Sequence, residues 1–118
     1  MHNYKELKIW QEGIELAKAV YKASADFPSD ERFGLTSQVR RAVVSIPSNI
    51  AEGHRRRRPG YIHHVEIALG SHGELHTQSI LAYRRRFIGD ADRVKLESML
   101  AQVGRLIHGL LRSLEAGL

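Results

Sequence analysis

One stretch, residues 33–53, constrains the fold more than any other part of the chain. Its apolar residues recur at intervals of three and four, the spacing that lines one face of an α-helix. These apolar residues are Leu35, Val39, Ala42, Val43, Ile46 and Ile50. We therefore expect a core-facing helix here, with Thr36 or Ser37 capping its start and Gly53 ending it in the left-handed conformation.

Pro47 lies inside this predicted helix. Proline has no N–H group to donate to the carbonyl of Val43, and its ring presses on that carbonyl. Because the apolar spacing resumes at Ile50, we expect a kink at Pro47 rather than the end of the helix. Polar residues that flank the bend can hydrogen-bond to the carbonyls it frees. They are Ser45, Ser48 and Asn49.

Three further segments have helical spacing. The first covers about residues 5–27, and another begins with Pro59 in its first turn and runs to about Phe87. The last begins after Gly89, with Asp90 or Asp92 as its cap. Four helices, short connections and no credible strand predict an all-α fold. We expect one domain over residues 1–118, an antiparallel up-down-up-down four-helix bundle whose second helix is kinked at Pro47.

The first predicted helix has two adjacent apolar seams. A single seam is enough to pack a helix into a bundle, so a second one favours burial against a neighbouring subunit. A wide core-facing stripe in a monomer explains the same pattern. One seam consists of Leu7, Trp10, Ile14, Ala17 and Tyr21, and the other of Ile9, Gly13, Leu16, Val20, Ala23 and Phe27.

The third predicted helix contains Gly70, Ser71 and Gly73, which are poor helix formers. Each glycine costs up to about 1 kcal/mol relative to alanine in a helix. That cost is tolerated more easily where a neighbouring helix packs against the bare backbone. We therefore expect close helix contact at these positions.

The composition limits the possible chemistry. The chain of 118 residues has 18 lysines and arginines against 13 acidic residues, a formal net charge of +5 that permits an acidic partner. It has no cysteine, which excludes disulfides and thiolate metal sites and fits a reducing compartment. The N-terminus has no long apolar run, so we expect neither a signal peptide nor a membrane span, and a cytoplasmic location.

The motifs FGLTSQVRRAVVSIPSNIAEG at residues 33–53, IALGSHGEL at 67–75 and GRLIHGLLRSL at 104–114 carry a resemblance to a known family. The chain resembles, over residues 7–114, the bacterial four-helix-bundle proteins encoded in intervening sequences of 23S ribosomal RNA genes. The resemblance implies an antiparallel bundle that assembles as a homopentamer, without known catalytic residues. That family is similar to the accessory protein of diversity-generating retroelements, which binds nucleic acid and a reverse transcriptase.

His72 and His76 are four residues apart, a spacing at which two helix residues can share a metal ion. However, Glu74 does not directly follow the first histidine, as it would in a zinc-protease motif, and it points to the opposite side of the helix. A third ligand is missing unless His108 approaches. We therefore expect no metal site, and histidines that hydrogen-bond in a polar layer of the bundle.

No other residues form a catalytic pattern. Ser45, Ser48 and Ser71 lack the neighbouring histidine and acid that a nucleophile needs, and no glycine-rich loop follows a strand. We expect His63 and His64 to be solvated residues on a helix face. The sequence thus predicts a protein that is not an enzyme, with no catalytic residue and no cofactor.

Two arginine runs are the best signal of function. The four-arginine run (Arg55, Arg56, Arg57 and Arg58) follows the second helix, and residues 84–86 close the third. Helix C-termini attract cations by about 0.3 to 1 kcal/mol each, which is a purely structural explanation of both runs. In an antiparallel bundle the runs lie at opposite ends. Acidic residues neutralise much of the charge near residues 84–86, namely Asp26, Asp30, Glu31, Asp90 and Asp92.

At the end with the four-arginine run, the charge is less neutralised, and Lys5, Lys8 and Arg112 add to it. Repeated around a ring of subunits, this end becomes a basic collar that can bind the backbone of RNA or DNA. The competing hypothesis is a protein-interaction scaffold that does not bind nucleic acid directly, with an unknown protein partner. In that case the arginines serve solubility or the helix ends.

Overall fold

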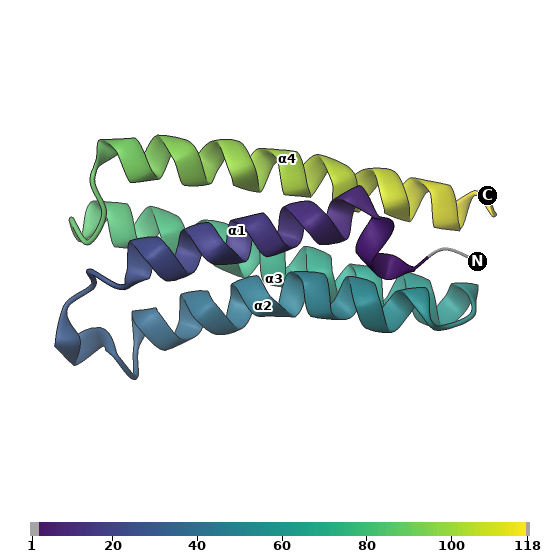
Figure 1. Cartoon of the computed structure of the whole chain (residues 1–118), viewed down its shortest axis with the longest axis horizontal. Coiled ribbons are helices and arrows are strands. Elements are labelled where there is room, and N and C mark those ends of the chain that lie inside the picture. Colours follow the sequence, from purple (N-terminus) through teal and green to yellow (C-terminus); the bar gives the residue numbers. More distant parts are fainter. Residues whose placement is uncertain (1–2, 118) are drawn as a thin grey trace.

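The computed structural model describes residues 3–117 and contains four helices. They are α1 (Lys8–Ser24), α2 (Leu35–His54), α3 (Arg58–Arg84) and α4 (Asp90–Glu115), with the short 3-10 turns η1 (Tyr4–Glu6) and η2 (Ser29–Glu31) before α1 and α2. Figure 1 shows that successive helices run in opposite directions and that each connection lies at an end of the bundle. The predicted all-α four-helix bundle is therefore confirmed. In the part of the chain that is described, no helix is both long and apolar enough to cross a membrane.

The helices pack in the cyclic order α1, α2, α3, α4, and the contact between α2 and α3 is the most extensive. The bundle measures 44 × 25 × 20 Å. Large aliphatic side chains from all four helices fill its centre, each contributing about 1.5 to 3 kcal/mol when it is withdrawn from water. Those that are fully buried are Leu16, Val43, Ile46, Ile50, Val65, Leu75, Leu100, Val103 and Ile107.

Helix α1 buries one of its two apolar seams and leaves the other partly exposed. The buried seam contains Ile9, Gly13, Leu16 and Val20. The outward seam is half-buried along most of its length, and its Tyr21 is 45% exposed. The core of the bundle therefore covers the outward seam only in part.

The predicted N-terminal cap of α2 is wrong. Thr36 and Ser37 lie inside the first turn, and the helix begins at Leu35. The Oε1 atom of Glu31 accepts a hydrogen bond of 3.0 Å from the backbone N–H of Leu35. The cap thus comes from Glu31 in the preceding turn η2. The spacing of apolar residues within α2 could not indicate it.

Gly53 does not end α2 in the left-handed conformation, as predicted, because the helix continues to His54. Gly53 is instead a buried contact with α3: a Cβ atom there would lie 2.9 Å from both Tyr61 Cδ1 and His64 Cβ. Helix α2 also continues through Pro47, as expected, while the kink at that residue stays a prediction.

The glycines at close helix contacts are not those predicted. Among the described residues, a Cβ atom on Gly70 or Gly73 would meet nothing within 4 Å, so the prediction of close packing is wrong for both. Close contacts occur at Gly13 and Gly104, where an added Cβ atom would lie 3.3 Å from the Pro47 ring and 3.1 Å from the His72 ring. The bulky residue that a glycine faces in the fold therefore indicates close helix packing better than the position of the glycine in a sequence motif.

The end of helix α3 is followed by an arginine in the left-handed conformation. Its last residue is Arg84, and Arg86 adopts a positive φ of 63°. The N–H groups of Arg86 and Phe87 donate to the carbonyls of Tyr83 and Ala82, at 2.9 and 2.8 Å. These two bonds form a Schellman motif, in which the left-handed position is usually a glycine.

The predicted side-chain cap of α4 is also wrong. The helix begins at Asp90, and Gly89 at its N-cap offers no side chain. Asp90 uses its Oδ1 atom to accept a hydrogen bond of 2.6 Å from the Tyr83 hydroxyl. The acidic first turn is therefore linked to α3 rather than to its own backbone.

Candidate nucleic-acid interface

The four-arginine run forms the turn between α2 and α3. Arg55 is the C-cap of α2, and Arg56 donates its backbone N–H to the Gly53 carbonyl at 2.9 Å. Arg57 is the N-cap of α3, and Arg58 is its first residue. All four residues are exposed, so the turn presents four guanidinium groups to solvent.

The helix ends explain only part of this charge. Arg55 and Arg56 lie at the C-terminus of α2, where unsatisfied carbonyls favour cations. Arg57 and Arg58 lie at the N-terminus of α3, where the unsatisfied N–H groups disfavour cations. In contrast, residues 84–86 all lie at the C-terminus of α3. The attraction of cations to helix C-termini therefore accounts for residues 84–86. It does not account for Arg57 and Arg58, which are half of the four-arginine run.

Two arginines of the run have close neighbours. Arg56 Nη2 lies 3.5 Å from Glu52 Oε1, and both side chains are about half exposed. An ion pair in such a position typically contributes about 0 to 1 kcal/mol, so it leaves Arg56 available to a stronger anion. Arg58 lies beside the C-terminal segment, where its Nη1 atom would be 3.3 Å from a Cβ atom on Gly117.

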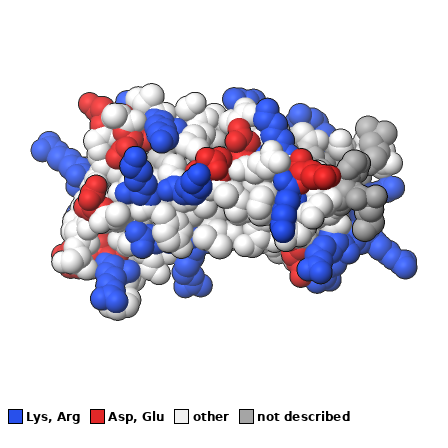
Figure 2. Space-filling view, viewed as in Figure 1, with Lys and Arg blue, Asp and Glu red and all other residues white. Residues whose placement is uncertain are grey.

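The supporting residues of the predicted collar are all exposed. Lys5 is in η1, Lys8 begins α1 and Arg112 is in the last turn of α4. Figure 1 shows that both chain ends lie toward the same end of the bundle as the α2–α3 turn. On the face seen in Figure 2, basic and acidic side chains are interspersed along the length of the bundle. The seven predicted residues thus share one end of the bundle.

A hydrogen-bond chain that the sequence did not predict lies between α2 and α3, close to the turn. Asn49 Nδ2 donates to Ser45 Oγ at 3.0 Å, so Asn49 Oδ1 is the acceptor for His64 Nδ1 at 2.9 Å. Ser71 Oγ donates to Ser45 Oγ at 2.8 Å. His64 is half-buried, so the prediction that it is a solvated residue is wrong. In the sequence, His64 directly follows the exposed His63, and the local pattern does not indicate that His64 bonds to Asn49.

Tyr61 closes the inner side of the same turn. Its ring meets the His54 ring edge-on, with 5.9 Å between the ring centroids, and it covers Gly53. Burial raises the pKa of the Tyr61 hydroxyl above its ordinary value, because the neutral form tolerates the loss of water better than the phenolate. Tyr61, His54 and Gly53 therefore pack together beneath the exposed arginines of the turn.

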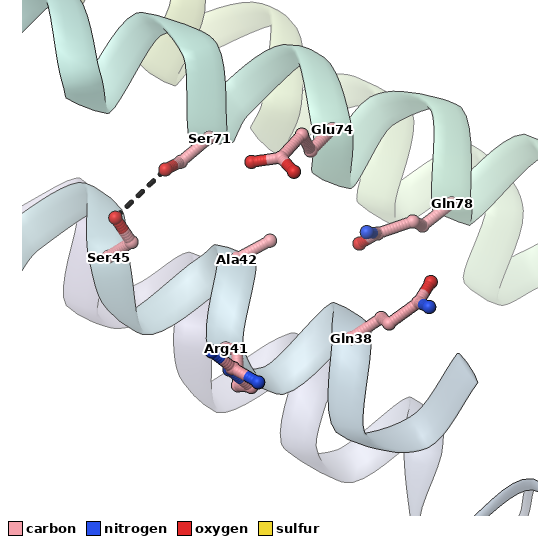
Figure 3. A pocket seen from close by; sticks show the side chains of 7 residues that line it. All are labelled: Gln38, Arg41, Ala42, Ser45, Ser71, Glu74 and Gln78. Carbon is pink, nitrogen blue, oxygen red and sulfur yellow. Dashed lines mark hydrogen bonds between the residues drawn. The ribbon is translucent and has the colours of Figure 1, made fainter. Parts of the chain in front are cut away.

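An open polar groove of about 460 Å³ runs between α2 and α3. Figure 3 shows Glu74, Gln38 and Gln78 pointing into the space between the two helices, with the Ser45–Ser71 hydrogen bond at one end. The Oε1 atom of Gln78 is buried and has no hydrogen-bond partner within residues 3–117. The groove therefore offers hydrogen-bonding groups from both helices.

His72, one of the two histidines considered as metal ligands, packs against α4. His72 Nε2 donates to the backbone carbonyl of Leu100 at 2.7 Å, in agreement with the predicted hydrogen-bonding role. The His76 ring lies 6.5 Å from the His72 ring and is exposed. Within residues 3–117, no group of three or more histidine, cysteine or acidic residues is placed to hold a metal ion.

A second surface with aromatic and basic side chains lies at the opposite end of the bundle, and the sequence did not predict it. It is an open hollow of about 610 Å³ between the end of α1, the α1–α2 connection and the first half of α2. Two aromatic rings and three arginines contribute to it, and we call it the aromatic–arginine hollow. Its lining residues are Tyr21, Arg32, Phe33, Thr36, Ser37, Arg40, Arg41, Val44 and Ser45.

The fold and these surfaces define a small all-α bundle protein with an arginine-rich turn at one end. The sequence profile of the 23S rRNA-intervening sequence protein family matches residues 5–109, so the chain belongs to that family. No curated protein sequence matches the chain. A crystal structure of a protein of unknown function from the S23 ribosomal protein family of Bacteroides thetaiotaomicron is similar, with a TM-score of 0.78 and 20% identity. The match covers 87% of this chain and 97% of the other, and at this identity it shows the fold alone.

Proposed function

We propose that this protein is a non-enzymatic, homo-oligomeric bundle that binds the phosphate backbone of RNA or DNA in the cytoplasm. The four-arginine run makes the main contacts, and Lys5, Lys8 and Arg112 support it. The observation that carries the proposal is the position of Arg57 and Arg58 at the N-terminus of α3, where the helix itself disfavours cations. A binding partner with negative charge accounts for arginines at these positions.

Oligomerisation raises the affinity of this protein for a nucleic-acid backbone. Phosphate-driven affinity grows with the number of phosphates neutralised, and one four-arginine turn neutralises few. The resemblance to the family implies five subunits. In a closed ring each subunit presents one patch and receives another, so five turns come together in one basic collar.

The part of the outward seam of α1 from Trp10 to Ala17, which leaves out Tyr21, supports the assembly. Together with α2 it forms an open groove of about 280 Å³, which includes Trp10, Ile14, Ala17 and Pro47. Burying such apolar surface stabilises a contact by about 25 cal/mol per Å². We therefore place the contact between subunits on this groove.

A protein-interaction scaffold is the second candidate, and one feature favours it. Helix α3 exposes three aliphatic side chains, Ile67 at 38%, Ile80 at 37% and Leu81 at 50%. A protein partner that covers one or more of these side chains would not require the arginines. The two candidates therefore differ in their dependence on salt.

A filter-binding titration of the untagged protein against labelled RNA and DNA tests the proposal. The logarithm of the affinity should fall linearly with the logarithm of the salt concentration, with a slope of about −0.7 to −0.9 per phosphate contacted. Absence of binding at low salt would reject the proposal and leave the scaffold. Light scattering at micromolar concentration should give a mass near five subunits, and a folded monomer would reject the collar.

A matched pair of variants tests the contact between subunits. Ala17→Glu places a charge in the outward groove and should lower the mass, because a buried carboxylate is strongly disfavoured. Ala101→Glu makes the same change at an exposed position of α4 and should leave the mass unchanged. Equal masses for both variants would place the contact elsewhere.

A further inference from the structure

The aromatic–arginine hollow combines features that the four-arginine run lacks. Phe33 is 89% exposed, more than any other large hydrophobic residue described, and Tyr21 is 45% exposed. None of the residues that line the hollow is acidic. Glu31, in the same connection, does not line it and is engaged with the N-terminus of α2. The hollow is therefore a basic surface with aromatic rings open to solvent.

Phe33 has a ring face available for stacking. The Arg32 guanidinium lies over the ring, 5.2 Å from its centroid, and can cover only one of the two faces. The fold gains little from this ring, because it remains in water. An exposed aromatic residue beside cationic groups is typical of surfaces that stack bases.

Arg40 is held in place as a donor. Its Nε atom donates to Ser24 Oγ at 2.9 Å, its Nη2 atom donates to the Tyr21 carbonyl at 3.4 Å, and the group lies 4.7 Å from the centroid of the Tyr21 ring. A guanidinium has five N–H donors, so three remain for a ligand. Because Ser24 is buried, the position of Arg40 is fixed by the bundle rather than by solvent.

Arg41 and Ser45 extend the surface across α2. Both line the hollow, and both also line the polar groove between α2 and α3 that Figure 3 shows. The Arg41 side chain is exposed and can contact a phosphate from either side. A chain of nucleotides can thus continue from the aromatic rings toward the groove.

We propose that the aromatic–arginine hollow binds an unpaired segment of nucleic acid, with a base stacked on Phe33 and the flanking phosphates bound by Arg40 and Arg41. The inference takes its ligand class from the proposed function, but it rests on different residues at the opposite end of the bundle. A duplex keeps its base faces stacked inside, so only unpaired nucleotides can use the Phe33 ring. The hollow therefore prefers single strands, while the four-arginine run contacts any backbone.

The test compares two variants of Phe33 on two probes, a 12-nucleotide RNA without self-complementarity and a 12-base-pair RNA duplex. Phe33→Leu keeps an apolar side chain but removes the ring, and it should weaken single-strand binding by about 5- to 150-fold. Duplex binding should not change. Phe33→Trp retains a ring and should bind the single strand as tightly as the wild type. Val94→Ala, a change at a residue of α4 that is 58% exposed, should alter neither affinity.

Photocrosslinking supplies a readout that does not depend on affinity. A single strand that contains 5-iodouracil should crosslink to the peptides that carry Tyr21 and Phe33. Crosslinks found only elsewhere would overturn the inference, as would equal single-strand affinity for Phe33→Leu and the wild type. A changed mass of Phe33→Leu in light scattering would also overturn it, because the ring would then belong to a contact between subunits.

The outcomes separate this inference from the proposed function. If neutralising the four-arginine run abolishes binding while Phe33→Leu has no effect, the inference fails and the proposed function stands. If Phe33→Leu alone weakens binding, the hollow stands and the four-arginine run is rejected as the main contact. A wild-type protein that binds neither probe rejects both.

Discussion

Gly53 of α2 lies so close to Tyr61 of α3 that a Cβ atom on Gly53 would come within 2.9 Å of the Tyr61 Cδ1 atom. This approach lets the chain reverse through the short turn that carries the arginines. It also explains a buried glycine near the end of a helix, where alanine would otherwise be favoured by about 1 kcal/mol.

Substitution of glycines by alanine should therefore have opposite effects at two positions. Gly53→Ala should destabilise the subunit by about 1 to 3 kcal/mol, because the added methyl group overpacks the contact with Tyr61 and His64. Gly70→Ala, with nothing within 4 Å, should stabilise it by about 0.5 to 1 kcal/mol. Urea unfolding measures both. A destabilising Gly70→Ala with a lower mass would instead place a neighbouring subunit on this face of α3.

The hydrogen-bond chain between α2 and α3 gives a second prediction. Asn49→Ala removes the group that connects Ser45 with His64, and it should lower the free energy of unfolding by about 1 to 3 kcal/mol. Ser48→Ala changes the exposed neighbouring residue and should alter it by less than about 0.5 kcal/mol. Similar values for the two variants in urea unfolding would show that the chain contributes little.

The left-handed conformation of Arg86 gives a third prediction. Arg86→Gly should raise the melting temperature, because a non-glycine residue at positive φ costs about 1 to 2 kcal/mol, more than the entropy that glycine adds to the unfolded chain. Arg85→Gly loses the same charge at a residue with a φ of −80° and should lower the melting temperature. Melting temperatures that fall equally in both variants would contradict the role assigned to the backbone.

Tyr61 should make stability depend on alkaline pH. Its pKa is raised above 10.0 by burial in the folded protein. The stabilising contribution is therefore fully present below the unfolded pKa and is lost as the pH rises through the raised folded pKa. Tyr61→Phe lacks this group, so its stability relative to the wild type should increase between about pH 8 and about pH 11. A difference in urea unfolding that stays constant with pH would contradict this prediction.

The sequence was sufficient for the architecture, because helical periodicity depends on residues that are close in the chain. The seam with Val43, Ile46 and Ile50 specified a core helix, and the structure buries all three. Boundaries were less predictable where partners come from other segments. The Glu31 cap and the role of Gly53 depend on contacts with other segments, which the spacing of apolar residues within one helix does not reveal.

The candidate site was only partly predictable for the same reason. Four consecutive arginines are visible in any reading of the sequence, whereas the aromatic–arginine hollow is assembled from three segments. Tyr21 comes from α1, Phe33 from the connection and Arg40 from α2. A tyrosine on the outward seam and a phenylalanine outside the helical pattern were the available signals, and neither indicates the other without the fold.

The most direct test of backbone binding compares the salt dependence of affinity in two four-residue variants. One changes Arg55, Arg56, Arg57 and Arg58 to glutamine, and the control does the same to four exposed cations elsewhere, Lys18, Arg84, Lys95 and Arg105. Both variants lose the same net charge, so only the position of the charge differs. We predict that the first variant binds duplex RNA weakly and has a flatter slope of log affinity against log salt, by about 0.7 to 0.9 for each phosphate that is no longer neutralised. The control should keep a slope close to that of the wild type. Equal slopes for the two variants would show that the four-arginine run is not the main contact with the backbone.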